Sequence, residues 1–297
     1  MAISRSQLVK ELEPGLNALF GLEYKRYENQ HAEIYTTESS DRAFEEEVML
    51  SGFANAQVKG EGSGVSFDEA QETFTARYTH ETVALAFAIT EEAIEDNLYD
   101  RLASRYTKAL ARSMSNAKQV KSVEPLINGL PTADAFDSGD GVSLFNTSHP
   151  TVAGTFANTL ATQADLNETS LEQSLIDIAA MTDERGLRIA ARGVKMIIPS
   201  ELQFTAERLM KSQGRTGTAD NDINAIVSMG MIPQGYRVNN YLTDSDAFYI
   251  LTDVPNGMKM FNRAPLTTAM EGDFDTGNVR YKARERYSFG VSDPRGI

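Results

Sequence analysis

The amino-acid sequence predicts an α+β fold, with extended strands before one long helix and mixed helices and strands after it. The strongest observation is a change of period within residues 83–120. Apolar residues alternate along 83–89, as they do in a strand with one buried face. From Ile94 they recur at helical spacing, at Leu98, Leu102, Tyr106, Leu110, Met114 and Ala117. The later segments mix both periods without an internal repeat.

Composition narrows the class of protein. The chain has 297 residues, 41% of them hydrophobic, which is enough for one large domain or two ordinary ones. The absence of cysteine excludes disulfides and thiolate sites and fits synthesis in the cytosol. No apolar run approaches the ~18 residues of a membrane span, and we expect no secretory signal. The net charge of −14 argues against nucleic-acid binding by the molecule as a whole and favours solubility.

Residues 1–42 are predicted to form an N-terminal arm. Leucines and a phenylalanine recur at helical spacing along 8–20, and Pro14 interrupts them, which predicts a short broken helix. A polar segment follows through His31 and Tyr35. The arm has too little apolar surface to fold alone, so we expect it to lie against another part of the protein.

Residues 43–89 are predicted to form an extended two-stranded ribbon. The first strand contains Phe44, Val48 and Leu50, and the return strand has Phe74, Ala76 and Tyr78 on one face. A flexible polar tip joins them: Lys59, Gly60, Glu61, Gly62, Ser63 and Gly64. Because a lone two-stranded ribbon is marginal in water, this one needs a neighbour to lie upon.

The long helix is predicted over 91–120, with Thr90 as its N-cap, and would be about 45 Å long. The helix dipole favours anions in its first turns, where four acidic residues lie: Glu91, Glu92, Glu95 and Asp96. It favours cations in the later turns, which contain Lys108, Arg112, Lys118 and Lys121. A helix this long usually serves as a structural beam.

The second half of the chain is predicted to begin with a long loop over 122–166. A capping box at 169–172 opens a helix that ends near Arg185, before Gly186. Ser200 and Gln203 suggest a second capping box, for a helix that ends near Ser212. A short helix is expected over 221–229, and strands over 193–198, 236–242, 247–252, 258–263 and 279–291, with a hairpin turn at Pro255-Asn256-Gly257.

No residues form a recognisable catalytic, cofactor or metal site, so we expect neither an enzyme nor a cofactor. The histidines His31, His80 and His149 lie in different segments, and we expect His149 to pack or cap a loop. Asp134, Asp137 and Asp140 are spaced by three, whereas a calcium loop needs ligands at alternate positions, so a surface loop is favoured. The glycines at 60, 62 and 64 do not fit the dinucleotide-binding pattern.

The most distinct polar pattern lies on the last strand, where cations alternate with other residues and so share one face. This basic strand face consists of Arg280, Lys282, Arg284 and Arg286. The first interpretation is pairing with an acidic surface, such as Glu91, Glu92 and Glu95, of this or a neighbouring subunit. The second is a solvated edge strand whose charge prevents aggregation. The third is contact with nucleic acid inside a container.

Several segments, taken in order, resemble tailed-bacteriophage major capsid proteins, in particular relatives of the Mu-type major head subunit. The arm and the ribbon come first, and five further stretches carry the resemblance: 88–100 (AITEEAIEDNLYD), 144–150 (LFNTSHP), 194–199 (VKMIIP), 248–253 (FYILTD) and 289–296 (FGVSDPRG). The resemblance implies the Hong Kong 97-type fold. Its parts would be an N-terminal arm at 1–42, an extended loop at 43–89, a peripheral domain at 90–186 with the spine helix 91–120, an axial domain at 187–262, and return strands of the peripheral domain at 263–297.

The resemblance also implies the function of a major capsid protein. Such a protein assembles into hexamers and pentamers of an icosahedral shell that encloses double-stranded DNA, and its extended loop lies across the adjacent subunit. We expect assembly in the bacterial cytoplasm, with a separate scaffolding protein and a portal as partners, with or without a decoration protein, and no membrane. Lys59 lies on the extended loop, but no residue identifies a cross-linking partner, so cross-linking is not predicted. An encapsulin-like cargo compartment and an enzyme are the alternatives.

Overall fold

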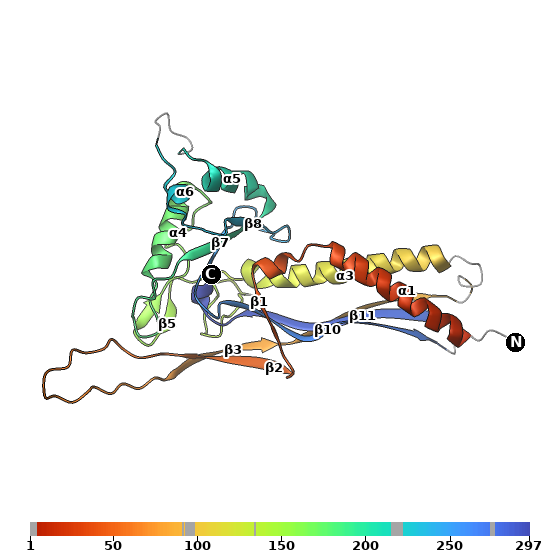
Figure 1. Cartoon of the computed structure of the whole chain (residues 1–297), viewed down its shortest axis with the longest axis horizontal. Coiled ribbons are helices and arrows are strands. Elements are labelled where there is room, and N and C mark those ends of the chain that lie inside the picture. The colour runs from red at the N-terminus through yellow and green to blue at the C-terminus, as the bar shows by residue number, and fades with distance from the viewer. Residues whose placement is uncertain (1–4, 91, 93–98, 134, 215–221, 274–276) are drawn as a thin grey trace.

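The computed structural model describes residues 5–90, 92, 99–133, 135–214, 222–273 and 277–297. Figure 1 shows three parts: a long body in which helices lie along a sheet, a second part built around a smaller sheet, and a ribbon that projects below both. Among the described residues, no helix is long and apolar enough to cross a membrane.

The body is built on a four-stranded sheet with the order β1-β10-β11-β4. The strands are β1 (Thr36–Ser39), β4 (Glu81–Ile89), β10 (Met258–Gly272) and β11 (Val279–Val291). Strand β1 is parallel to β10, and the other pairs are antiparallel. The predicted strand 279–291 is confirmed. It is hydrogen-bonded on both sides, however, so the interpretation of an edge strand is wrong.

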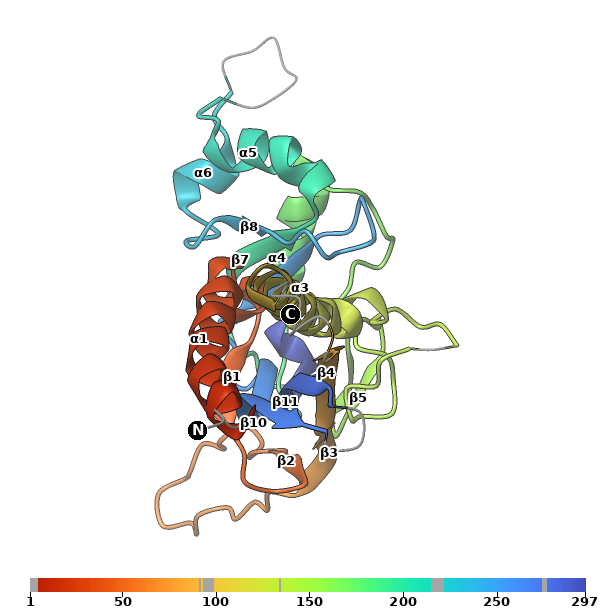
Figure 2. The same ribbon diagram turned by 90° about the vertical axis from the view of Figure 1, so that its right-hand side faces the viewer.

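Two helices, α1 (Arg5–Arg26) and α3 (Tyr99–Ile127), cover one face of this sheet (Figure 2). Leu110 and Met114 of α3 pack against Ile89 and Tyr281 of the sheet. The spine helix was predicted to end at 120, but it continues to Ile127. Val123 and Leu126 are fully buried, and this packing carries the helix further. Its predicted start, with Glu91, Glu95 and Asp96, lies outside the described residues, whereas Glu92 is described and exposed.

The predicted break at Pro14 is wrong, because α1 runs through it. A proline inside a helix removes one backbone hydrogen bond, and tertiary contacts offset that cost here. Leu16 and Phe20 are buried against α3 and the sheet. The Asn17 side chain accepts hydrogen bonds from Thr268 of β10 at 2.7 Å and Tyr281 of β11 at 2.8 Å. The arm therefore packs against the body, as expected from its small apolar surface.

The rest of the arm contacts the later turns of α3. The 3-10 helix η1 (Gln30–Glu33) contains His31, whose backbone N–H donates to the Gln119 side chain at 3.0 Å. The Gln119 amide hydrogen-bonds the ring Nδ1 of His31 at 3.1 Å. After η1 the chain forms β1 and extends the sheet at its edge.

The ribbon consists of β2 (Phe44–Leu50) and β3 (Glu72–Thr79), which pair antiparallel. Ala76 and Tyr78 are buried while Thr75, Arg77 and Thr79 are exposed, as the predicted faces required. The prediction extended the ribbon to residue 89, but Glu81–Ile89 pair with β11. The ribbon therefore ends near Thr79, and β4 belongs to the body.

The second part has a three-stranded sheet with the order β8-β7-β9. Its strands are β7 (Gly193–Ile198), β8 (Tyr236–Val238) and β9 (Tyr249–Thr252), and its helices are α4 (Glu168–Ala180), α5 (Gln203–Lys211) and α6 (Ala225–Met229). The helices pack their apolar residues against Met196 and Ile198 of β7. Short elements complete the chain: β5 (His149–Thr151), β6 (Gly154–Phe156), η2 (Ser200–Leu202) and η3 (Pro294–Gly296).

Several local predictions in this part are wrong by a few residues. Helix α4 begins after Asn167, whose side chain forms the capping box with Ser170, and it ends at Ala180, before the predicted Arg185. Helix α5 begins without a side-chain cap. The turn at 255–257 is not a hairpin, because β9 and β10, which it joins, pair in different sheets.

The contact between His31 and α3 predicts an acid-sensitive contribution to stability. Burial, with a contribution from the charge of Lys118, lowers the pKa of His31 from 6.5 to about 4. Between these values the unfolded chain binds a proton that the folded chain does not, so stability falls as the pH drops through this window. We expect the unassembled wild-type chain to lose on the order of 3 kcal/mol by about pH 4 through this group.

The matched variant is His31→Gln, which keeps a side-chain oxygen able to accept from Gln119 but does not titrate. Urea unfolding of both chains over this pH range, measured by circular dichroism, gives the difference between their free energies of unfolding. If the two chains lost stability in parallel with falling pH, the burial of a neutral His31 would be contradicted.

Candidate assembly surfaces

The base of the ribbon is held against the body by a buried cation. Lys259 of β10 contacts Glu47 of β2 at 2.5 Å and Glu38 of β1 at 3.1 Å. Burial alone would lower the pKa of Lys259, but the hydrogen bonds to Glu47 and Glu38 outweigh it and raise the pKa. The lysine stays charged, and the ion pairs fix the direction in which β2 leaves the sheet.

Tyr78 of the ribbon packs into a space that a glycine leaves open on β11. Its ring lies so close to Gly290 that an added Cβ would be 2.6 Å from the ring. The Tyr78 hydroxyl shares a hydrogen bond with Ser292 at 2.5 Å, and the ring packs edge-on against Phe261 at 4.7 Å between centroids. Next to it, His80 bridges Ser40 and Ser288 through its two ring nitrogens.

A third contact holds the return side of the ribbon further out. Arg185, in the turn after α4, donates to the backbone carbonyl of Glu69 and lies 4.0 Å from the Asp68 carboxylate. Asp68 accepts in turn from the backbone N–H of Ala54 on the outgoing side, at 2.7 Å. The two sides of the ribbon are therefore connected to each other and to the second part of the molecule.

Beyond these contacts, the tip of the ribbon is exposed. The predicted tip residues Lys59 to Gly64 lie at the turn, where Ser63 bonds back to Gly60 and Gly62 has a φ of 80°. The apolar side chains around the tip were not predicted to be exposed. Val58 is 100% and Phe67 98% exposed, and Leu50, Phe53 and Val65 are also exposed. The signal available in the sequence was the presence of apolar residues in a polar stretch that lacks the alternation of a strand.

The basic strand face lies on the side of the sheet opposite the helices. Arg280, Lys282 and Arg284 are exposed and Arg286 is half-buried. Arg280 pairs with Asp273, near the end of β10. Within the described residues, Lys282 and Arg284 have no ion pair, and none joins Glu92 to this face, while Glu91 and Glu95 lie outside them. Ala84, Ala86 and Ala88 of β4 lie opposite these cations, so only short side chains flank the cations on that strand.

Buried charges in the body and near the C-terminus are paired instead. Glu285 faces the helices from within the alternation of β11, and Lys118 of α3 lies 3.2 Å from it. Burial raises the pKa of Glu285, and Lys118 opposes that rise. Arg295 is buried 2.7 Å from Glu184 and 3.2 Å from Asp293, which joins η3 to the turn after α4. The alternation of β11 places Glu285 on the face toward the helices, and its partner Lys118 is distant in sequence.

His149 packs a loop, as predicted. It is fully buried, with Nδ1 2.6 Å from Asp140 and Nε2 3.0 Å from the side-chain oxygen of Asn158. Burial alone would raise the pKa of Asp140. Hydrogen bonds from His149 and Ser138 have the larger, opposite effect, so the pKa of Asp140 is lowered. Asp137 accepts from the backbone of the glycines at 139 and 141. Asp134 lies outside the described residues, which contain no cluster of metal ligands.

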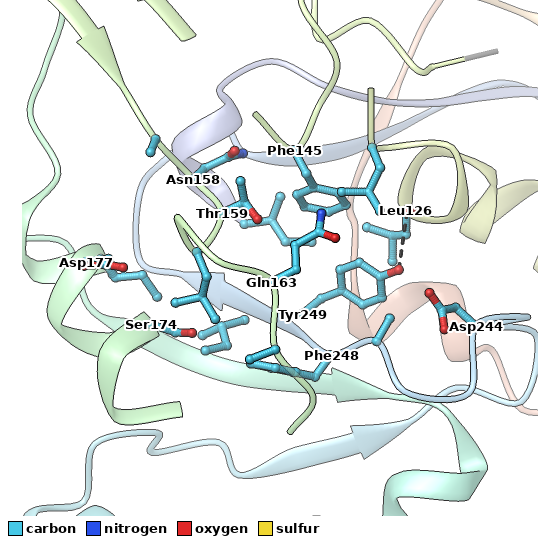
Figure 3. A pocket seen from close by; sticks show the side chains of 18 of the residues that line it. Leu126, Phe145, Asn158, Thr159, Gln163, Ser174, Asp177, Asp244, Phe248 and Tyr249 are labelled. Atoms are coloured by element: carbon cyan, nitrogen blue, oxygen red, sulfur yellow. Dashed lines mark hydrogen bonds between the residues drawn. The ribbon is translucent and has the colours of Figure 1, made fainter. Parts of the chain in front are cut away.

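A pocket of about 340 Å³ lies where the end of α3 meets α4 and β9 (Figure 3). Leu126, Phe145, Phe248 and Tyr249 line it with apolar surface, and Tyr249 donates to the Leu126 carbonyl at 3.4 Å. Aspartates provide the charged residues of its lining, which includes neither histidine nor a basic residue.

Comparisons with known proteins agree with this architecture. The model of the phage capsid protein family matches residues 72–297. The structure is similar to one from Mycobacterium phage Ogopogo, with a TM-score of 0.52, 12% identity and 90% of each chain covered. It is similar to the virus-like particle from Pyrococcus furiosus, with a TM-score of 0.50, 11% identity and 95% of each chain covered. For the capsid of an empty GTA particle, the TM-score is 0.50, the identity 14% and the coverage 89% of this chain and 86% of that one. A comparison with curated protein sequences gives no match.

The fold is that of the Hong Kong 97-type capsid proteins, since similar structures extend over nearly the whole chain. Because the family match covers most of its length, the chain belongs to the phage capsid protein family. The resemblance to tailed-bacteriophage major capsid proteins is confirmed, and the protein is a structural protein of the phage capsid. The closer likeness to the Mu-type subunit stays a prediction.

The close approach of Tyr78 and Gly290 gives a test of how the ribbon is held. In Gly290→Ala the new methyl group overlaps the ring, so Tyr78 must move, at a cost of about 1–3 kcal/mol. We expect a lower melting temperature and faster proteolysis within residues 51–71. The control is Gly272→Ala in β10, where nothing lies within 4 Å of an added Cβ and the change should stay within about 0.5 kcal/mol. Identical melting and proteolysis of the two variants would contradict this packing.

Proposed function

We propose that this protein assembles into the hexamers and pentamers of an icosahedral phage shell that encloses double-stranded DNA. The family match supports a shell protein. The observation that carries the assembly proposal is the ribbon: Lys259 and Tyr78 hold its base and Arg185 holds its return side, while its tip exposes apolar side chains. A ribbon held in one direction with an uncovered apolar tip is suited to contact a second copy.

The contact between copies is heterologous, because the tip of one subunit meets a different surface on the next. Contacts of this kind close into rings when the rotation between subunits closes. Burying Val58 and Phe67 on a neighbour would contribute about 1.5–3 kcal/mol for each side chain. Each contact is modest, and a closed shell repeats it around every ring.

Charge supports the basic strand face as the surface that receives the ribbon. Residues 43–79 contain seven acidic and two basic residues, so the ribbon has a net charge of 2 − 7 = −5. The ribbon lies on the side of the sheet opposite the helices (Figure 1), and the basic strand face is on that side too, because Tyr281 and Ala283 between its cations pack toward the helices. An acidic ribbon crossing a neighbour's unpaired Lys282 and Arg284 would bring opposite charges together, which favours correct register.

The domain assignment follows from this proposal. The N-terminal arm is 1–42, and the extended loop begins at 43, with its two-stranded part ending near Thr79. The expected bounds, 90–186 with 263–297 for the peripheral domain and 187–262 for the axial domain that meets its copies at the centre of each ring, shift in two places. Helix α4 packs on β7 and joins the axial domain, and the whole of β10 pairs in the body sheet and joins the peripheral domain. We propose assembly in the host bacterial cytoplasm, with a separate scaffolding protein, a portal and decoration proteins as partners.

Deleting residues 58–66 tests the role of the ribbon tip. The residues lie beyond the contacts that hold the base, so the chain should keep its melting temperature but fail to form closed shells in negative-stain electron microscopy. A finer variant is Val58→Ser with Phe67→Ser, compared with Leu22→Ser and Ile176→Ser, which remove exposed apolar side chains elsewhere. Normal particles from the deleted chain would contradict the proposed contact.

Reversing charge on the basic strand face tests the receiving surface. Arg284→Glu with Arg286→Glu places like charges opposite an acidic ribbon, which costs several kcal/mol per contact and should abolish most of the particle yield. The control is Arg188→Glu with Arg192→Glu, two exposed cations in the second part. Equal particle yields at equal melting temperatures would leave this face without a role in assembly.

A further inference from the structure

Helix α3 carries a second basic surface, on the opposite side of the body from the basic strand face. Residues 101–123 contain six basic residues and no acidic one, in a chain whose net charge is −14. Two of the six, Lys118 and Lys121, form ion pairs with Glu285 and Glu81. The remaining cations therefore need a separate explanation.

Three of these cations form one exposed row, which we call the spine row: Arg105, Lys108 and Arg112. At 100° per residue they lie within about 60° of one another around the helix, and they span about 10 Å along it. Within the described residues, none of the three has an ion pair. Ala109 and Asn116, which lie beside them on the same face of the helix, are short and exposed, and Arg112 lies near Tyr27, just after α1.

The helix dipole does not account for this row. Cations are favoured in the last turn of a helix, and the effect fades within that turn. Arg105 and Lys108 lie in the first half of α3, which begins at Tyr99. Packing does not account for it either, because the side of α3 that faces the sheet is formed by other residues, such as Leu110 and Met114.

We infer that the spine row is a contact surface for the phosphate backbone of double-stranded DNA. The inference rests on the proposed function, in which the shell encloses DNA. The ribbon lies on the sheet side of the body, so subunit contacts made by the ribbon occupy that side and leave the helix side uncovered. DNA is then the polyanion available to that side, and three cations over about 10 Å match its dense charge, about one per 3.4 Å on each strand.

The overall acidity of the chain does not prevent this contact. At physiological ionic strength, exposed charges act over about 8 Å, so a local row outweighs more distant carboxylates. Binding through phosphates alone is independent of sequence and weakens steeply with salt. We expect weak contacts that become important when many copies face the same DNA.

The test uses the full unassembled chain and a short labelled DNA duplex, with binding followed by fluorescence anisotropy over a series of salt concentrations. Changing Arg105, Lys108 and Arg112 to Gln should weaken binding at least about tenfold at low salt. It should reduce the slope of log K against log salt by about 2.7, at ~0.9 for each phosphate that is no longer neutralised. The variant with Arg105→Lys and Arg112→Lys keeps the charge and should keep the slope.

Two controls match this reduction in charge. The first control changes Arg188, Arg192 and Arg208 to Gln. This variant loses three exposed cations elsewhere and should bind DNA nearly as the wild type does. The second control changes Lys282, Arg284 and Arg286 to Gln and removes three of the four cations of the basic strand face. A larger loss of DNA binding in this variant than in the spine-row variant would overturn the inference. Equal binding of poly-glutamate and DNA to the wild-type row would also overturn it, in favour of an acidic polypeptide.

Electron microscopy of the same preparations separates this inference from the proposed function. The spine-row variant should still form closed particles, because the row lies away from the proposed ribbon contact. If the wild-type chain formed no particles even with the proposed scaffolding protein present, the proposed function would fail. If particles formed and the spine-row variant bound DNA as the wild type does, the spine-row inference alone would fail.

Discussion

The alternation of side chains along β11 is the constraint on which the rest of the structure depends. The strand is hydrogen-bonded to β10 and β4, so its register fixes which side chains face the helices and which face the opposite side. Tyr281 and Glu285 point toward the helices and meet Phe20 and Lys118. Past its end, Arg295 joins the body to the second part. A slip of one residue would reverse every one of these contacts.

Burial differs among the parts of the molecule: the body and the second part each bury a core, whereas the ribbon is buried only at its base. This difference explains how a stable body carries a segment that is incomplete alone. The body covers one face of its sheet with α1 and α3, and the second part packs helices on β7. The ribbon has two strands and can bury a face only where its base meets the sheet. Its tip has nothing beneath it among the described residues. Contacts at the base fix the direction of the tip without covering it, which is what a contact between copies requires.

The charged residues also differ between the interior and the surface of the molecule. Buried cations are paired, as Lys259 and Arg295 are with two carboxylates each, because an unpaired buried charge would cost several kcal/mol. Exposed cations without an ion pair among the described residues include two sets on opposite sides of the body, Lys282 with Arg284 and the spine row. An acidic protein that keeps such sets free can attract anionic partners on each side, since charges beyond about 8 Å are screened.

The sequence by itself determined the periodic elements: the strand 279–291, the strand 193–198, the long helix and the buried role of His149. These follow from local spacing, which a single chain displays. Tertiary structure alone decided that α1 passes through Pro14 and that β4 pairs with β11. It also decided that the basic strand face lies on a central strand and not on an edge. Local patterns give the period of an element and its apolar face, whereas the partner that covers this face comes from residues far away in the sequence.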